Sequence, residues 1–209
     1  MKILILGASG LVGSSLLKQA LSHPGISLVV APSRKPLPLH PKLICPLVSF
    51  ESLPPAEEWW HVDAIICALG TTIKKAQSKD AFCRVDHDYP LLAAQMGQKN
   101  GVKTYVLNSA AGANLDSPIF YNKVKGEVEN DLIKMNFHSL TIARPGLIGG
   151  DRKESRPGEY FAKCITKALR PILPKKFHLN EPEAIAAKTL EAALLAKPGV
   201  HILSSESFV

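Results

Sequence analysis

The 209-residue sequence has no closely spaced pair of cysteines, and its aromatic residues make up only 6% of the chain. The four cysteines stand far apart and form no C-x-x-C motif; they are Cys45, Cys67, Cys83 and Cys164. Neither these cysteines nor the histidines have the spacing of metal ligands, which argues against a zinc site. We therefore expect reduced thiols and no bound metal.

No dense run of basic residues accompanies the formal net charge of +7. Lysine and arginine are spread along the chain, so an anionic cofactor and a solvated basic surface explain the charge more simply than nucleic-acid binding does. No apolar run is long enough to span a bilayer, and the chain starts with a strand-like segment rather than with the layout of a signal peptide. These features predict a cytoplasmic protein with a small-molecule substrate, without a membrane span and without a nucleic-acid partner.

No shift of composition, internal repeat or low-complexity tract divides the chain. Its length suits one α/β domain with a substantial core, and we expect residues 1–209 to form this domain. From residue 151 onward the pattern changes to a charged loop, a helix at 160–169, a Pro- and Lys-rich connection and a helix at 181–196. Residues 151–209 are therefore predicted to form a cap on the substrate side of the domain.

The first stretch of the chain has the pattern of a phosphate-binding turn. The apolar run Ile3–Leu6 is typical of a parallel strand buried on both faces, and residues 14–20 have a helical pattern. Between them, Gly7, Gly10 and Gly13 give the spacing G-x-x-G-x-x-G. Glycines permit a tight turn and a close approach of the backbone, while the N–H groups and dipole of a helix start favour a pyrophosphate. The alternative is an ordinary strand–turn–helix in which the glycines serve only the turn.

The second predicted strand, Ile26–Ala31, is followed by basic rather than acidic residues. In a dinucleotide-binding fold an acidic residue here often holds the ribose 2′-hydroxyl, but this strand leads to Ser33, Arg34 and Lys35. A guanidinium with an ammonium beside it suits a 2′-phosphate, so the sequence predicts NADP(H) in preference to NAD(H). A solvated basic loop is the alternative.

Strand and helix patterns alternate along most of the chain. Further strands are expected at 43–50, 62–69, 104–108, 138–143 and 200–203, helices at 79–99 and 118–135, and a short helix or turn at 51–60. This alternation predicts right-handed β-α-β crossovers and a doubly wound parallel sheet, the Rossmann arrangement. Pro90 falls inside the predicted helix 79–99 and should kink or interrupt it. Gly70 and Thr71 follow the fourth strand, at the edge where such sheets bind cofactors.

Tyr121 and Lys125 stand four residues apart in the predicted helix 118–135, so they share one face. An ammonium group beside a phenol favours the phenolate, and it brings the phenol pKa from about 10 toward the range useful for proton transfer at neutral pH. Ser109, at the end of the preceding strand, could hydrogen-bond a substrate carbonyl. A Y-x-x-x-K pair alone is a weak signal that also fits a surface pair. Ser109 has no histidine partner in a motif, so nucleophilic hydrolysis is not supported.

In this order and at these distances, the glycine turn, Ser109, Tyr121 and Lys125 resemble the short-chain dehydrogenase/reductase superfamily. Longer segments resemble its atypical branch, the Tat-interacting-oxidoreductase-like proteins. These segments are Cys67–Thr72 (CALGTT), Val85–Tyr89 (VDHDY), Tyr121–Glu129 (YNKVKGEVE), Arg144–Gly146 (RPG) and Asp151–Glu159 (DRKESRPGE). The resemblance covers nearly the whole chain, and its last segment is specific.

The resemblance implies a Rossmann fold that binds NADPH, and a reaction in which Tyr121 gives a proton to a carbonyl that takes hydride from the cofactor. Ser109 would orient the carbonyl, and Lys125 would hold the nicotinamide ribose and assist Tyr121. The implied cofactor contacts are Gly7, Ser9, Gly10, Leu11 and Val12 at the pyrophosphate, Arg34 with Ser33 at the 2′-phosphate, Leu69, Gly70 and Thr71 along the cofactor, Lys125 at the ribose, and Pro145 and Ile148 near the nicotinamide.

Two positions depart from the pattern of the wider superfamily. Many members have a catalytic Asn on the helix after the fourth strand, where this chain has Asp86. Residues 48–50, with the sequence Val-Ser-Phe, stand where relatives often have an Asp for the adenine. The proton relay and the adenine contact are therefore open. The charged residues at 151–156 either shape a substrate pocket or form an ion-paired loop.

Two functions from different classes fit the sequence. The first is an NADP(H)-dependent oxidoreductase of the short-chain dehydrogenase/reductase type that acts on a small carbonyl or alcohol, which the set Ser109, Tyr121 and Lys125 favours. The second is a catalytically weak or inactive NADPH-binding regulator or scaffold, in which the cofactor changes a surface for a protein partner. Asp86 and the short C-terminal tail favour this second function, and the fold alone does not decide between them.

Overall fold

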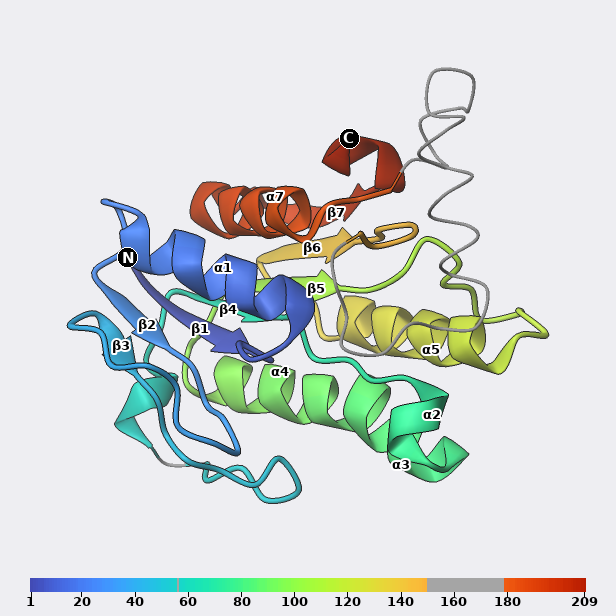
Figure 1. The fold of residues 1–209 in the computed structure, drawn as a ribbon, viewed down its shortest axis with the longest axis horizontal. Coiled ribbons are helices and arrows are strands. Elements are labelled where there is room, and N and C mark those ends of the chain that lie inside the picture. Colours follow the sequence, from blue (N-terminus) through green and yellow to red (C-terminus); the bar gives the residue numbers. More distant parts are fainter. Residues whose placement is uncertain (56, 150–178) are drawn as a thin grey trace.

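Seven parallel strands form one sheet in the order β3-β2-β1-β4-β5-β6-β7 (Figure 1). The computed structural model describes residues 1–55, 57–149 and 179–209. The strands are β1 (Lys2–Leu6), β2 (Leu28–Val30), β3 (Leu43–Ile44), β4 (Ala64–Cys67), β5 (Thr104–Asn108), β6 (Ser139–Ala143) and β7 (Gly199–Leu203). The chain builds outward from β1 to one edge, returns to β4 and continues to the other edge. Sheets wound in this way bind ligands beyond the carboxyl ends of the strands, where the strand order reverses.

Helices cover both faces of this sheet (Figure 1). On one face α1 (Leu11–Ser22) packs against α7 (Pro182–Leu195), and on the other α4 (Tyr89–Lys99) packs against α5 (Phe120–Lys134). The shorter elements are α2 (Ile73–Ala76), α3 (Lys79–Cys83), the π-helical turn η2 (Arg84–Asp88), and the 3-10 turns η1 (Glu58–Trp60) and η4 (Ser205–Phe208). Within the described ranges, no helix is both long and apolar enough to cross a membrane.

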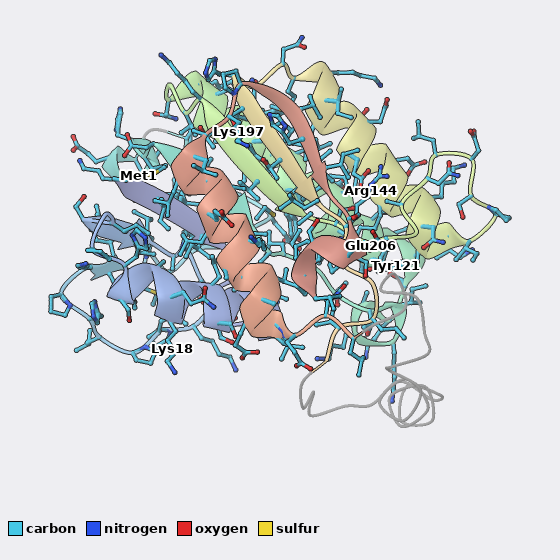
Figure 2. All side chains as sticks on the ribbon, turned by 90° about the horizontal axis from the view of Figure 1, so that it is seen from above. Met1, Lys18, Tyr121, Arg144, Lys197 and Glu206 are labelled. Atoms are coloured by element: carbon cyan, nitrogen blue, oxygen red, sulfur yellow. The ribbon has the colours of Figure 1, made fainter. Side chains whose placement is uncertain are left out.

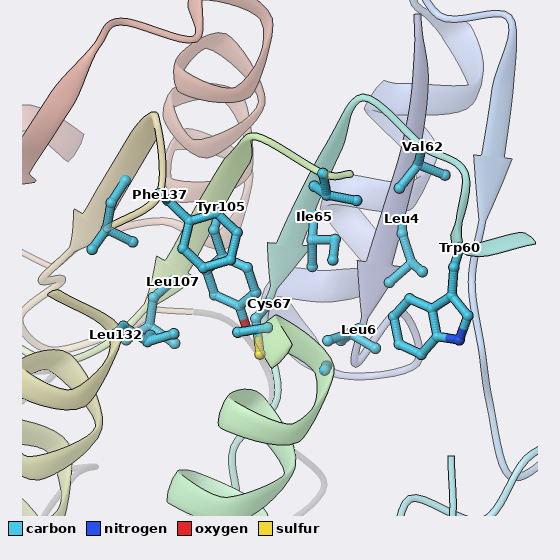
Figure 3. Packing of buried hydrophobic residues seen from close by; sticks show 14 of the residues in the cluster. Leu4, Leu6, Trp60, Val62, Ile65, Cys67, Tyr105, Leu107, Leu132 and Phe137 are labelled. Carbon is cyan, nitrogen blue, oxygen red and sulfur yellow. The ribbon is translucent and has the colours of Figure 1, made fainter. Parts of the chain in front are cut away.

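Side chains of the strands alternate between two buried hydrophobic layers. In β1, Leu4 and Leu6 belong to the layer under α4 and α5, whereas Ile3 and Ile5 belong to the layer under α1 and α7. Trp60 closes the first layer, and its indole Nε1 donates a hydrogen bond to the Pro54 carbonyl (Figure 3). Because both faces of β1 are covered, every position of its apolar run is needed in the core.

The predicted doubly wound Rossmann sheet is confirmed. The observed strands differ from the predicted ones mainly in length. β2 and β3 are shorter than the strands expected at 26–31 and 43–50. Pro46 has no N–H to donate to a ladder, so regular pairing ends at Ile44. Pairing resumes only as an isolated bridge between Ser33 and Leu47.

The helix expected at 79–99 is divided into α3, η2 and α4. Pro90 has no N–H and lies in the first turn of α4, where this loss is tolerated. Just before it, the Tyr89 N–H bonds to the Arg84 carbonyl five residues back, which makes η2 a π-helical turn. This turn buries the carboxylate of Asp86.

The remaining helix predictions had mixed outcomes. The short helix or turn expected at 51–60 is present as the 3-10 turn η1 at its end, and α5 begins two residues later than predicted. The helix and strand expected at 181–196 and 200–203 are present as α7 and β7. The helix expected at 160–169 lies outside the described residues, as does the charged loop at 151–156.

Candidate functional site

The glycine turn brings the start of α1 against the carboxyl ends of β1 and β4. Gly7 has a φ of +81°, a conformation that favours glycine, and a Cβ there would lie 2.7 Å from the Ala68 carbonyl oxygen. A Cβ at Gly13 would lie 2.0 Å from the Gly7 carbonyl oxygen, so that position also requires glycine. Gly10 caps α1 without any side-chain hydrogen bond. The first N–H groups of α1 therefore meet no capping side chain, which suits a diphosphate.

Three further predicted contacts belong to this turn. Ser9 is exposed and Leu11 is partly buried. The Val12 side chain is buried among Ala143, Ile185 and Phe208. Only its backbone is therefore placed to contribute to a phosphate cradle.

The carboxyl end of β2 carries the two residues predicted to lie near the adenosine. Ser33 is buried and donates its N–H to the Pro46 carbonyl, and its own carbonyl accepts the Val48 N–H at 3.0 Å. Arg34 follows it and is exposed. The guanidinium thus sits on a strand end that the neighbouring chain holds in place.

The loop after β4 is joined to α5 through Asp86. The Thr71 N–H donates to one carboxylate oxygen of Asp86 at 2.8 Å. The other carboxylate oxygen lies 2.8 Å from Lys125 Nζ, and the two side chains are 1% and 4% exposed. Leu69 and Gly70 precede this contact, at the predicted cofactor edge. Asp86 therefore fixes both the loop predicted to lie along the cofactor and the lysine predicted to hold the ribose.

The charge state of Lys125 follows from its surroundings. Burial favours the neutral amine, but the charge of Asp86 and the interaction with Tyr121 outweigh it, so the pKa of Lys125 is raised above its ordinary value. Lys125 is therefore an ammonium group throughout the neutral range. Tyr121 lies one turn earlier on α5, partly buried, and its ring packs against Phe82 with centroids 5.7 Å apart.

A second buried polar group joins α5 to the ends of β5 and β6. The Ser109 hydroxyl donates to the Glu129 carboxylate. Arg144 Nε donates to both oxygens of the same carboxylate at 3.2 and 3.1 Å. Ser109 and Glu129 are buried, while Arg144 is partly exposed and lies on the same side of the molecule as Tyr121 (Figure 2). The Ser109 proton is thus directed at Glu129 in this arrangement.

Glu129 and Arg144 were not among the predicted site residues, although the sequence held a signal for them. Glu129 follows Lys125 by four residues, so it had to lie on the same face of α5. Arg144 directly follows β6, the neighbour of β5 in the sheet. The buried partner of Ser109 could therefore have been sought there.

The segment predicted near the nicotinamide is fastened to the C-terminal part of the chain. The Gly146 N–H donates to Asn180 Oδ1 at 2.7 Å, and this oxygen also accepts the Ser205 hydroxyl at 2.9 Å. Ile148 pairs with Asn180 in an isolated bridge, and Pro145 is buried. These contacts fix the loop after β6 beside the carboxyl ends of the strands.

The structure thus gathers the predicted residues at one edge of the sheet, on the loops after β1, β2, β4, β5 and β6 and on one face of α5. Their individual roles stay predictions. Within residues 1–55, 57–149 and 179–209, no group of three His, Cys, Asp or Glu residues is placed to hold a metal ion.

Curated proteins similar to this chain come from mammals and fungi, whereas no family model matches it. Protein HTATIP2 of Rattus norvegicus is 39% identical over 172 residues, covering 80% of this chain and 71% of its own. Protein FMP52, mitochondrial, of Candida albicans is 37% identical over 174 residues, covering 79% and 75%. Protein fmp52, mitochondrial, of Emericella nidulans is 31% identical over 214 residues, covering 98% and 92%.

Solved structures with the same fold are more distant in sequence. MoeE5 in complex with UDP-glucose and NAD matches with a TM-score of 0.73 at 16% identity, covering 97% of this chain and 75% of its own. The oxidoreductase ylbE from Lactococcus lactis matches with a TM-score of 0.68 at 21% identity, covering 99% and 94%. At these identities the likeness shows the fold alone.

The names of the fungal relatives contradict the predicted cytoplasmic location. Several of them are named mitochondrial, which points away from a purely cytoplasmic protein. The prediction failed because unpaired cysteines and the absence of a secretory pattern argue only against secretion. They do not distinguish between compartments inside the cell.

Proposed function

Since the chain belongs to the HTATIP2/FMP52 family of NAD(P)-binding atypical short-chain dehydrogenase/reductases, we propose that it is an NADP(H)-dependent oxidoreductase acting on a small carbonyl or alcohol. The observation that carries this proposal is the buried ion pair of Lys125 and Asp86, one helical turn from Tyr121. A buried ion pair adds little stability compared with apolar packing, so its position beside a phenol supports a chemical role.

The residues at the sheet edge fit a dinucleotide. Gly7 and Gly13, where a Cβ would collide with backbone, allow the tight turn that leads into α1, and the start of α1 has no capping side chain, which suits a diphosphate. Arg34 and the lack of an acidic residue at the end of β2 support NADP(H) over NAD(H). When bound, NADPH supplies the hydride for the carbonyl carbon.

The protein would supply the proton and the positioning. Tyr121 would donate its phenolic proton to the carbonyl oxygen as that oxygen gains negative charge. Lys125 would stabilise the resulting phenolate, and Asp86 would keep the ammonium group in place. Ser109 would orient the carbonyl only after its hydroxyl turns from Glu129 to the substrate, which exchanges one hydrogen bond for another.

A second function is favoured by the same two buried groups. Asp86 compensates the charge of Lys125, and Glu129 takes the proton of Ser109. Both contacts are satisfied without a substrate, as they would be in an NADPH-binding regulator that performs no turnover. In that case, binding of the cofactor would change the affinity for a protein partner.

A panel of small aldehydes and ketones, with NADPH consumption as the readout, tests the first function. Turnover is expected for at least one compound, and Tyr121→Phe should lower it by about 100-fold, within the usual range for a lost proton donor. Tyr121→Phe keeps the ring packed on Phe82 and serves as its own folding control. If no compound is reduced while NADPH changes the capture of a partner in pull-downs, the regulator is the correct function.

A further inference from the structure

An open pocket of about 640 Å³ lies between the chain that follows β3 and the start of α4. Its lining consists of Phe50, Glu51, Arg84, Asp88, Tyr89 and Leu92. The start of α4 lies at the carboxyl edge of the sheet, because the chain reaches it from β4 through α2, α3 and η2 (Figure 1). The pocket therefore belongs to the edge at which the cofactor is proposed to bind, and its size is ordinary for a small ligand.

One side of this pocket is connected to Arg34. The carbonyl of Ser33 accepts the N–H of Val48, which holds the end of β2 beside the chain leading to Phe50. The Phe50 ring stacks on Tyr89, with centroids 5.9 Å apart and planes inclined by 28°. Arg34 thus approaches an aromatic pair from the side of β2.

Arg84 approaches the same aromatic pair from the side of η2. It lines the pocket together with Tyr89. The charges of Arg84 and Arg34 favour the ionised Tyr89 hydroxyl, but burial and the charge of Glu51 outweigh them, so the pKa of Tyr89 is raised. Two guanidinium groups from different elements therefore act on the same tyrosine.

The two acidic residues of the pocket differ in their surroundings. Asp88 Oδ1 lies 2.8 Å from Nδ1 of His87, so this carboxylate already has a partner. Glu51 acts directly on Tyr89 and opposes the two arginines. A phosphate group in this pocket would be attracted by both guanidinium groups and repelled by the carboxylate of Glu51.

We infer that Arg84 is a second guanidinium for the 2′-phosphate of NADP(H), acting together with Arg34. The inference rests on the proposed NADP(H) function and adds a residue that selects the nucleotide. Arg84 is exposed and lines the pocket, so its side chain can reach a phosphate oxygen there. The turn η2 would then contact both halves of the cofactor, with Arg84 at the adenosine and Asp86 holding Lys125 at the ribose of the nicotinamide.

Calorimetric titration of the full chain with 2′,5′-ADP and with 5′-AMP tests this inference without any need for catalysis. The wild type is expected to bind 2′,5′-ADP more tightly. Arg84→Gln should lower the affinity for 2′,5′-ADP by about 10- to 100-fold, as expected for a lost charge-assisted hydrogen bond. It should change the affinity for 5′-AMP by less than about twofold. Arg84→Lys should restore part of the lost affinity, and Glu51→Gln should raise the affinity for 2′,5′-ADP.

Lys99→Gln, at the far end of α4, is the matched control for loss of one positive charge and should leave both ligands unchanged. If Arg84→Gln lowers the affinity for both ligands equally, Arg84 contacts the adenine and the inference is overturned. It is also overturned if neither affinity changes. If the wild type discriminates and Arg34→Gln removes the discrimination while Arg84→Gln does not, only the inference fails. If the wild type binds neither ligand, the proposed cofactor itself fails.

Discussion

Lys125 Nζ lies 2.8 Å from Asp86 Oδ1, and this ion pair is almost completely shielded from water. The pair joins α5 to the π-helical turn η2, and through Thr71 to the loop after β4. An ammonium group so placed remains charged only while its carboxylate partner is present. The stability of the protein and the chemistry proposed for Tyr121 therefore depend on the same contact.

Asp86→Ala should lower the free energy of unfolding by about 3 to 5 kcal/mol, because it leaves a buried cation and the Thr71 N–H without a partner. Asp86→Asn keeps an acceptor for the Thr71 N–H and should lower the free energy of unfolding by less. Urea unfolding measures this free energy for both variants. Asp131→Ala is the control, since Asp131 pairs with Lys134 at the surface and should cost less than about 1 kcal/mol. Similar losses at Asp86 and Asp131 would contradict the buried pair.

Stability at alkaline pH should depend on Lys125. Its pKa is raised in the folded state, so its contribution is complete below the ordinary lysine pKa of about 10.4 and is lost as the pH rises through the folded value. Wild type should therefore lose more stability between neutral pH and about pH 11 than Lys125→Met does. Thermal unfolding along this pH range measures the difference, and other alkaline titrations cancel because both chains share them. If the stabilities of wild type and Lys125→Met fall in parallel as the pH rises, the ion pair is excluded.

The pair Glu129 and Arg144 should respond unequally to mutation. Among the described residues, Arg144→Ala leaves the buried Glu129 carboxylate with Ser109 as its one hydrogen-bond partner, whereas Glu129→Gln leaves an arginine that is already 32% exposed and can be hydrated. We expect Arg144→Ala to cost more than Glu129→Gln, by about 1 to 2 kcal/mol. Chemical unfolding of the two variants, with Ser109→Ala as a third, decides this. The opposite order would mean that the arginine, not the carboxylate, depends on the contact.

Gly13→Ala should disrupt nucleotide binding, because its Cβ would lie 2.0 Å from the Gly7 carbonyl oxygen. The turn must open to relieve this collision, and a loss of NADPH affinity by more than about tenfold is expected from fluorescence titration. Gly101→Ala is the control. Gly101 has a φ of +83° but nothing within 4 Å of an added Cβ, so alanine strains the backbone far from the turn. That variant should lose about 1 kcal/mol of stability and keep its affinity for NADPH.

The outline of the fold could be predicted because it depends on local patterns. Buried parallel strands require continuous apolar runs such as Ile3–Leu6, and the turn after β1 requires Gly7 and Gly13 for steric reasons. The division of the helix at 79–99 was harder to predict. Pro90 signalled an interruption, but it gave no sign that the interruption would be a π-helical turn that buries Asp86.

The partners of the predicted site residues depend on contacts between distant elements. Asp86 lies in η2, Lys125 and Glu129 lie in α5, and Ser109 and Arg144 directly follow β5 and β6. Helix periodicity placed Tyr121 and Lys125 on one face but did not reveal these pairings. Ser109 in particular was expected to face a substrate, whereas the fold gives its proton to Glu129.

The bridge between Ile148 and Asn180 brings together the two ends of a long intervening segment. Since Asn180 also hydrogen-bonds Gly146 and Ser205, the loop predicted to lie beside the nicotinamide is held by contacts outside that segment. The points at which the chain leaves the sheet edge after β6 and returns to it before α7 are therefore set by the sheet side of the molecule.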